Sequence, residues 1–307
     1  MGQWRVEEQQ IAGLLRQACD AGPNAVQSEQ PSDVGGQQSA EDRSTEIDSI
    51  AWALKYDLIR TRQPIPIRQQ SGPRMRQSST SVVTLVTTCM GRLEHLKQSL
   101  PRMVAQEACR VVVVDFSCPQ NTGDWVRQEF GDQDVTVVSV PGHTHYDRSE
   151  ARNRGWAAAE TPWIGFIDAD MLLSEEFSRQ VSQRLRPGRF LRCAMTSGAM
   201  GRGGLIVAAR DVLEAVNGYD PVYQGWGEED EDLVDALIFD GQRLADLPDA
   251  VASHIDHDDQ QRSEHHASES FRDRWLINRI YRLAKWDLAK QLGRVPSVDE
   301  CASLYRF

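Results

Sequence analysis

An alternation of strand-like and helix-like segments between residues 81 and 186 constrains the fold most strongly. Short apolar runs recur at 82–88, 110–114, 135–140 and 163–167, and helical patterns separate them. Strands that alternate with helices along a chain are typical of a parallel sheet covered by helices. The sequence therefore predicts an α/β fold with a parallel, doubly wound sheet flanked by helices.

The expected elements continue beyond this stretch. Helices are expected at 93–105, 124–130, 149–159, 174–186, 210–216, 229–239 and 269–292. Ser149 is a plausible cap for the third of them. Two further strands are expected at 190–195 and 204–209.

Composition divides the chain into three parts. Residues 1–80 are rich in Gln, Ser, Gly and charged residues, so we expect an N-terminal extension with helical segments and a partly disordered, flexible linker. Residues 81–260 form the predicted folded domain. Residues 261–307 are expected to contain an amphipathic helix that packs on this domain. This helix and the arginine-rich end of the extension are also candidates for peripheral contact with a membrane.

Charge and cysteine content narrow the class of protein. The formal net charge is −11, whereas nucleic-acid-binding domains are usually basic. No stretch approaches the ~20 apolar residues of a membrane helix. The six cysteines are scattered and contain no Cys-x-x-Cys pair. We therefore expect reduced thiols, a cytoplasmic location and no nucleic-acid partner. A peripheral position at the inner face of a membrane is the alternative location.

Two carboxylates end the apolar run at 163–167. Side chains two residues apart in an extended chain point the same way, so Asp168 and Asp170 can reach one ion or one diphosphate. Ligands bind at the carboxyl ends of strands in open α/β sheets. Oxygen ligands suit Mn²⁺ or Mg²⁺. A solvated loop after a strand is the alternative that this stretch leaves open.

A second acidic stretch follows a glycine-flanked aromatic residue. Gly225 and Gly227 flank Trp226, an arrangement that suggests a mobile loop placing the ring on a sugar face. Residues 228–232 are five consecutive acids, and one of them could accept the proton of an acceptor hydroxyl. Acids in the first turn of a helix are also favoured by the helix dipole, so a structural charge cluster is the alternative.

Six short motifs lie in residues 81–260. They are Thr-Thr-Cys-Met-Gly-Arg at 87–92, Asp-Phe-Ser at 115–117, Arg-Ser-Glu-Ala-Arg-Asn-Arg-Gly at 148–155, Gly-Gly-Leu-Ile at 203–206, Asn-Gly-Tyr-Asp at 217–220 and Gly-Trp-Gly-Glu-Glu-Asp-Glu-Asp at 225–232. Together they resemble a glycosyltransferase of the GT-A fold, which begins like family 2 and ends like the β-1,4-galactosyltransferases. The chain departs from these patterns at Phe116, Tyr219, Glu228 and Glu231, where the families often have Asp, Phe, Gly and Asp. The GT-A resemblance implies a Rossmann-like sheet that is mixed but mainly parallel and is flanked by helices.

The resemblance implies roles for individual residues. Asp230 is the implied catalytic base, and Trp226, Glu229 and Glu231 bind the acceptor. The implied ligands of Mn²⁺ or Mg²⁺ are Asp170, His257 and His254, the last at a position where the family more often has Met. The implied contacts of the nucleotide sugar are Thr87, Arg92, Asp115, Arg148, Arg152, Asn153, Asp168 and Gly204.

The implied activity is transfer of a hexose, galactosyl or N-acetylhexosaminyl, from a nucleotide-diphosphate sugar, most simply a UDP-sugar, to an acceptor hydroxyl. The acceptor would be a glycan, a lipid-linked sugar or a small molecule. Inversion is favoured because related retaining N-acetylgalactosaminyltransferases carry Asn where this chain has Asp230. Two alternatives remain: a catalytically inactive sugar- or nucleotide-binding protein and, ranked lower, a nucleotidyltransferase, whose glycine-rich loop the turn at 87–92 lacks.

Overall fold

The computed structural model describes residues 82–193, 203–255 and 271–304. In these residues a central sheet contains seven strands and a small second sheet contains two. The strands of the central sheet are β1 (Val83–Cys89), β2 (Cys109–Phe116), β3 (Val135–Val140), β4 (Trp163–Phe166), β6 (Arg189–Cys193), β7 (Ile206–Ala209) and β8 (Arg243–Leu247). The second sheet pairs β5 (Met171–Leu173) with β9 (Ala252–His254).

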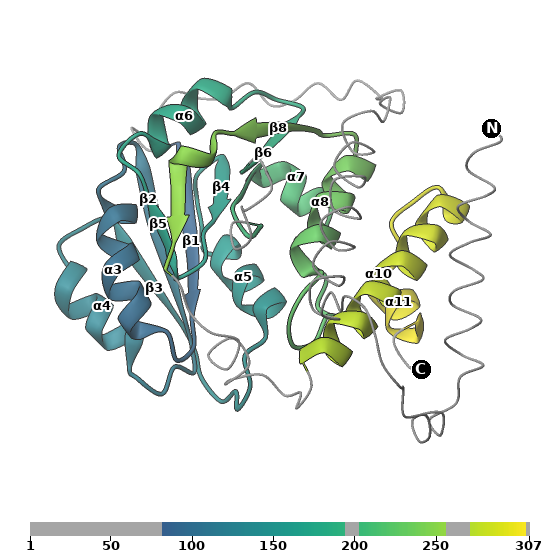
Figure 1. Ribbon diagram of the computed structural model, residues 1–307, viewed down its shortest axis with the longest axis horizontal. Helices are drawn as coiled ribbons and strands as arrows, with labels where there is room; N and C mark the ends of the chain where they lie inside the picture. The colour runs from purple at the N-terminus through teal and green to yellow at the C-terminus, as the bar shows by residue number, and fades with distance from the viewer. Residues whose placement is uncertain (1–81, 194–202, 256–270, 305–307) are drawn as a thin grey trace, which may run out of the picture. The chain divides into compact units, whose positions relative to one another are not determined.

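The central sheet has the strand order β3-β2-β1-β4-β7-β6-β8 (Figure 1). Its first four strands are parallel, β7 is antiparallel to both neighbours, and β8 is parallel to β6. The predicted α/β class, with a mixed and mainly parallel sheet flanked by helices, is confirmed.

Helices connect most of the strands, and further helices follow the last strand. They are α3 (Leu93–Val104), α4 (Thr122–Phe130), α5 (Arg148–Ala157), α6 (Phe177–Arg184), α7 (Arg210–Ala215), α8 (Glu229–Phe239), the 3₁₀ helix η1 (Asp249–Val251), α10 (Phe271–Leu292) and α11 (Val298–Leu304). The expected cap of α5 was wrong, because the helix begins one residue before Ser149. Asp147 caps it instead, and its carboxylate accepts a hydrogen bond of 2.8 Å from the Glu150 amide.

The two faces of β1 contribute to two separate cores. Leu85 and Cys89 pack on one side of the sheet, and Val86 packs on the other side with α5. Gly155 lets α5 lie close to the sheet, because a Cβ atom there would lie 2.3 Å from Cγ1 of Val86. Arg152, on the same helix, is thereby held close to the carboxylate that follows β4.

The register of the parallel strands brings three loops to one edge. Cys89 at the end of β1 pairs with Asp115 of β2, and Val86 pairs with Phe166 at the end of β4. The turn after β1, the loop after β2 and the carboxylates after β4 consequently lie at the carboxyl edge of the sheet, where α/β proteins bind ligands.

Helix α10 packs against α8 through buried charges (Figure 1). Nζ of Lys285 lies 2.6 Å from a carboxylate oxygen of Asp232 and 2.7 Å from one of Asp220. Nε1 of Trp286 donates to the other oxygen of Asp232 at 2.8 Å. A buried ion pair needs such additional hydrogen bonds to offset desolvation, so the contact defines one docking position for α10.

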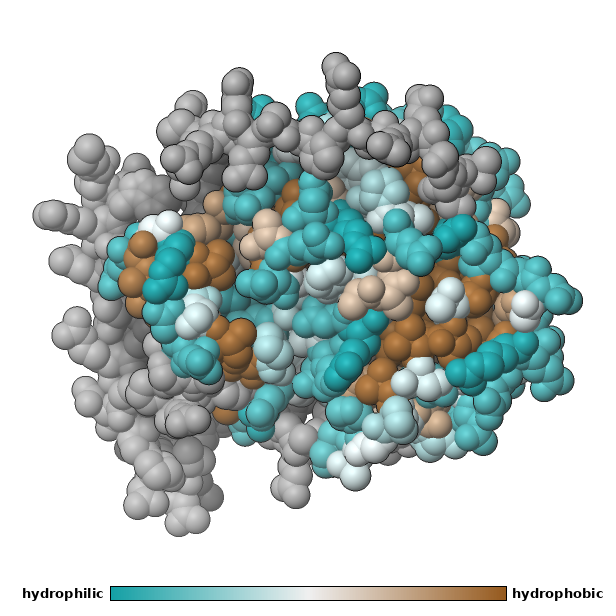
Figure 2. Space-filling model, turned by 180° about the vertical axis from the view of Figure 1, so that it is seen from behind, coloured by the Kyte–Doolittle hydropathy of each residue, from teal (hydrophilic) through white to brown (hydrophobic). Residues whose placement is uncertain are grey.

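Several expectations fall outside the described residues. These are the N-terminal extension 1–80 with its helices and arginine-rich end, and the candidate ligand His257. In the part of the chain that is described, no helix has both the length and the apolar character needed to cross a membrane. On the face shown in Figure 2, patches of apolar side chains alternate with hydrophilic ones.

Candidate active site

One buried guanidinium joins the two acidic stretches that the sequence singles out. Arg152 of α5 lies 2.8 Å from Asp168 after β4, 3.1 Å from Glu229 and 3.1 Å from Asp230 at the start of α8. Its Cζ atom also lies 4.9 Å from the ring centroid of Tyr219. The tertiary structure therefore places both predicted halves of the site around a single positive charge.

The adjacent acids Glu229 and Asp230 have different proton affinities. Burial raises the pKa of Asp230 to about 7, and the charges of Glu229 and Asp168 add to the rise while Arg152 opposes it. Burial also opposes ionisation of Glu229, but Arg148 and Arg152 outweigh it and lower the pKa of that carboxyl. Titratable neighbours whose environments push their pKa values apart are typical of acid–base sites.

Asp230 has a further hydrogen-bond donor. The hydroxyl of Tyr219 donates to Oδ1 of Asp230 over 3.0 Å. Burial holds the pKa of Tyr219 well above 10, so this phenol keeps its proton and remains a donor. The galactosyltransferase pattern has Phe at this position, so the donor is a feature of this chain that the sequence comparison did not identify.

Each of the five consecutive acids has a cationic partner. In chain order, Glu228 pairs with Arg282, Glu229 and Asp230 with Arg152, Glu231 with Arg192, and Asp232 with Lys285. Cations from α5, β6 and α10 thus relieve the repulsion among these five neighbouring acids. Three of the acids line the site and two hold α10.

Glu228 occupies a position where the family pattern has glycine, and it adopts a backbone conformation that favours glycine. Its φ is +72°, in the left-handed region that side chains other than Gly rarely adopt. The ion pair of 2.7 Å with Arg282 offsets the strain of this conformation. An ion pair with α10 therefore accompanies the left-handed backbone conformation of this residue.

Position 204 needs a glycine because the carboxylate of Asp168 leaves no room for a side chain there. A Cβ atom at position 204 would lie 2.4 Å from Oδ2 of Asp168, closer than side chains allow. Both residues were predicted to bind the nucleotide sugar, and the structure places them in contact.

Asp170 and His254 lie together at the start of the small sheet. The amide of Ile255 donates to the carbonyl oxygen of Asp170 at 2.8 Å, and His254 pairs with Met171 across β5 and β9. A carboxylate and an imidazole suit Mn²⁺. Among the described residues no three His, Cys, Asp or Glu side chains form a metal-sized cluster, and the third candidate, His257, lies outside them.

The predicted acceptor contacts approach the same region. The guanidinium of Arg148 lies 5.9 Å from the ring centroid of Trp226 and 3.7 Å from Glu229. Nη2 of Arg192, a buried residue of β6, lies 2.6 Å from Glu231. Trp226, Glu229 and Glu231 are thus each adjacent to an arginine.

Two residues that were predicted to contact the nucleotide form hydrogen bonds with the protein backbone. Asp115 accepts hydrogen bonds from the amides of Cys118 and Gly123, at 2.9 and 2.8 Å. The side-chain amide of Asn153 donates a hydrogen bond to the carbonyl oxygen of Tyr219, and its oxygen accepts one from the Tyr219 amide. Thr87 is fully buried within β1, and its hydroxyl has no hydrogen-bond partner among the described residues. Arg92 lies in the turn after β1, directly before α3.

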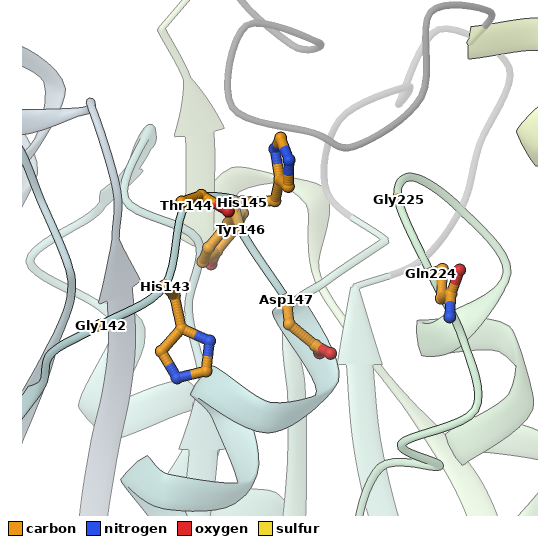
Figure 3. A pocket seen from close by; sticks show the side chains of 8 residues that line it. All are labelled: Gly142, His143, Thr144, His145, Tyr146, Asp147, Gln224 and Gly225. Carbon is orange, nitrogen blue, oxygen red and sulfur yellow. The ribbon is translucent and has the colours of Figure 1, made fainter.

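A cavity of about 380 Å³ lies between the loop before α5 and the glycine-flanked loop. Residues 142–147 line one side, and Gln224 and Gly225 line the other (Figure 3). In this view the carboxylate of Asp147 points towards the side of Gln224. Residues 142–147 were not predicted as site residues, because their only signal in the sequence is their position between a strand and the arginine motif.

Helix α10 holds the glycine-flanked loop through hydrogen bonds from one side chain. The buried amide of Asn278 donates to the carbonyl oxygens of Gln224, Trp226 and Gly227 at 3.0, 3.2 and 2.9 Å. A Cβ atom at Gly227 would lie 2.8 Å from Trp275. The loop that the sequence suggested to be mobile is thus tied to α10 at three carbonyls.

The fold and this site define the class of protein. The fold resembles that of the mannosyltransferase PcManGT from Pyrobaculum calidifontis in complex with GDP-Man and Mn²⁺, with a TM-score of 0.54 and 15% identity over 85% of this chain and 77% of that one. TarS of S. aureus, residues 1–349 in complex with UDP-GlcNAc, gives 0.54 and 13% identity over 73% and 70%. The chain therefore has a GT-A glycosyltransferase fold.

Two family models match two successive parts of the chain. Residues 84–190 match glycosyl transferase family 2, and residues 195–258 match the model described as the N-terminal domain of galactosyltransferase. A search of curated protein sequences finds no significant match. The resemblance read from the motifs is thus confirmed: a family 2-like first part is joined to a galactosyltransferase-like second part. Helices α10 and α11 lie beyond both matches.

Proposed function

We propose that the protein is a metal-dependent glycosyltransferase that moves a hexose from a UDP-sugar to an acceptor hydroxyl with inversion. One observation carries the proposal: Arg152 joins Asp168, at the strand end where the donor would bind, to Asp230, the implied base. Both family models and the fold are those of glycosyltransferases.

Asp230 is suited to the role of general base. With a pKa of about 7, its carboxylate is available near neutral pH and is basic enough to take the proton of an attacking hydroxyl. Glu229 stays ionised beside it and, with Glu231 and Trp226, binds the acceptor. Attack by the hydroxyl opposite the departing diphosphate is a single displacement, which inverts the anomeric carbon.

Asp170, His254 and His257 are the proposed ligands of the metal. The carboxylate and the imidazole that the structure describes fit Mn²⁺, and Mg²⁺ is the alternative. When bound, such an ion would neutralise the charge that develops on the diphosphate. The complex of PcManGT with GDP-Man and Mn²⁺ supports the use of a divalent metal.

UDP is the proposed nucleotide because the second part of the chain matches the galactosyltransferase model. A galactosyl or N-acetylhexosaminyl group is the proposed sugar, and the acceptor is a glycan, a lipid-linked sugar or a small molecule. The complex of TarS with UDP-GlcNAc supports a donor of this chemical class.

Thermal unfolding with UDP, GDP and their sugars, each with and without Mn²⁺, tests the binding step. A ligand at about a hundred times its Kd adds roughly 2.7 kcal/mol to the free energy of unfolding. We expect stabilisation by UDP that requires Mn²⁺ and is lost in Asp170→Ala. The matched control is Asp132→Ala, an exposed acid just before β3 at the opposite edge of the sheet.

Asp230→Asn separates an enzyme from an inactive binding protein. The variant should keep the stabilisation by UDP and Mn²⁺ but lose sugar transfer, measured as acceptor-dependent release of UDP. Full activity in this variant would refute the assignment of the base. Absence of any nucleotide effect on the wild-type protein would refute the proposed donor site.

A further inference from the structure

Two cysteines that the proposed mechanism does not use face each other at the carboxyl edge of the sheet. Cys89 is the last residue of β1, and Cys118 lies in the loop between β2 and α4. Their sulfur atoms are 4.0 Å apart, and both side chains are buried. The two residues are 29 positions apart in the sequence, so no local motif predicts that they are neighbours.

The surroundings of Cys118 stabilise a thiolate. The amide of Gly91 donates to its sulfur at 3.2 Å, and the hydroxyl of Thr122 donates at 3.0 Å. The hydrogen bond from Cys89 lowers the pKa of Cys118 most, burial opposes it, and Thr122 and Gly91 contribute further, so the pKa is about 5. The same contact and burial raise the pKa of Cys89. At neutral pH the pair is one thiolate beside one thiol.

We propose that Cys89 and Cys118 form a redox-modification site, at which a hydroperoxide oxidises the pair to an intramolecular disulfide. The thiolate of Cys118 attacks hydrogen peroxide, which gives a sulfenic acid and releases hydroxide. The thiol of Cys89 then attacks the sulfenic sulfur, the disulfide forms and one water leaves. Two electrons pass from the sulfurs to the peroxide, and a dithiol reductant reverses the reaction.

Oxidation would change the turn that follows β1. The sulfurs must approach from 4.0 Å to about 2.05 Å, so one of the loops moves. A disulfide sulfur is also a weaker acceptor for the Gly91 amide than a thiolate. The same two loops are further linked by the hydrogen bond of 2.9 Å from the Leu93 amide to Gln120.

This turn contains Arg92, a predicted nucleotide contact. We therefore expect oxidation to reduce the affinity for UDP by about tenfold, which corresponds to about 1.4 kcal/mol. This consequence rests on the proposed function, whereas formation of the disulfide does not.

The test treats the full-length protein with a small excess of hydrogen peroxide and maps peptides without reduction. We expect a cross-linked peptide that contains Cys89 and Cys118 and disappears with dithiothreitol. Cys118→Ser and Cys89→Ser should each abolish it. Cys109→Ser is the matched control, because burial raises the pKa of that thiol to about 12 and keeps it protonated.

Thr122→Val tests the thiolate without removing a cysteine. It should slow formation of the disulfide, because one donor to the sulfur of Cys118 is lost. If the mapped disulfides exclude the 89–118 pair, or Cys109 is oxidised at least as fast, the proposed modification site is refuted. If the disulfide forms while the Kd for UDP is unchanged, the coupling to the turn is refuted. If the reduced protein does not bind UDP, the proposed donor site fails, and peptide mapping still decides the modification.

Discussion

Replacing Tyr219 by Phe should move the pH dependence of catalysis. The substitution removes the hydroxyl that donates to Oδ1 of Asp230 over 3.0 Å and keeps the buried ring. That ring packs edge-on against Phe166, with centroids 4.9 Å apart, and Phe can keep the contact. Phe is also the residue of the galactosyltransferase pattern, so the variant should fold.

The size of the shift follows from the strength of the lost hydrogen bond. A hydrogen bond to an ionised group contributes about 1.5–3 kcal/mol, and one pKa unit corresponds to about 1.4 kcal/mol. The bond stabilises ionised Asp230, so its loss should raise the pKa from about 7 to about 8–9. A base must be deprotonated to act, so activity at pH 7 should fall about 5- to 50-fold and recover at higher pH.

The assay is kcat/KM for sugar transfer between pH 5.5 and 9.5, whose acidic limb reports the base in the free enzyme. Tyr223→Phe is the matched control, because that buried hydroxyl has no hydrogen-bond partner among the described residues. The control should leave the limb near pH 7. An unmoved limb in Tyr219→Phe, or a loss of activity that is equal at every pH, would refute the role given to this hydrogen bond.

Three further substitutions test the surroundings of the site. Gly204→Ala places a Cβ atom 2.4 Å from Asp168, so UDP affinity measured by calorimetry should fall about tenfold or more, and an unchanged Kd would contradict this. Lys285→Met leaves buried carboxylates unpaired and should cost about 3–5 kcal/mol in urea unfolding, whereas Lys290→Met, at an exposed ion pair, should cost less than about 1 kcal/mol. Asn278→Ala frees three loop carbonyls, so KM should rise about tenfold with a smaller change in kcat; equal kinetics would exclude a positioning role.

The sequence predicted the elements whose signal is local. The strand at 135–140 and the helix at 229–239 have the predicted bounds, because a run of valines and an acidic helix start are readable within one window. Strands β8 and β9 were missed. Their sequences, Arg-Leu-Ala-Asp-Leu and Ala-Ser-His, are short and contain no β-branched residues, so their pairing partners determine their conformation.

The sequence motifs singled out the acidic residues of the candidate site but did not predict which cations pair with them. Asp168 and Asp230 were singled out from their motifs, whereas the ion pairs of Arg152 with both carboxylates were not predicted. The cations of α10 were not connected with the acidic helix. Lys285 lies 53 residues from Asp232, and no spacing rule joins positions so far apart.

The sequence by itself determined the mainly parallel α/β architecture and the position of acids at strand and helix ends, because periodicity and terminal signals act over a few residues. Only the tertiary structure decided which acidic side chain pairs with which cationic side chain. Arg152 lies 16 residues from Asp168 and 78 from Asp230, and the folded chain brings all three within hydrogen-bonding distance. Burial and neighbouring charge then set the pKa of Asp230, because the energy of a charge depends on the atoms packed around it and not on its neighbours in the chain.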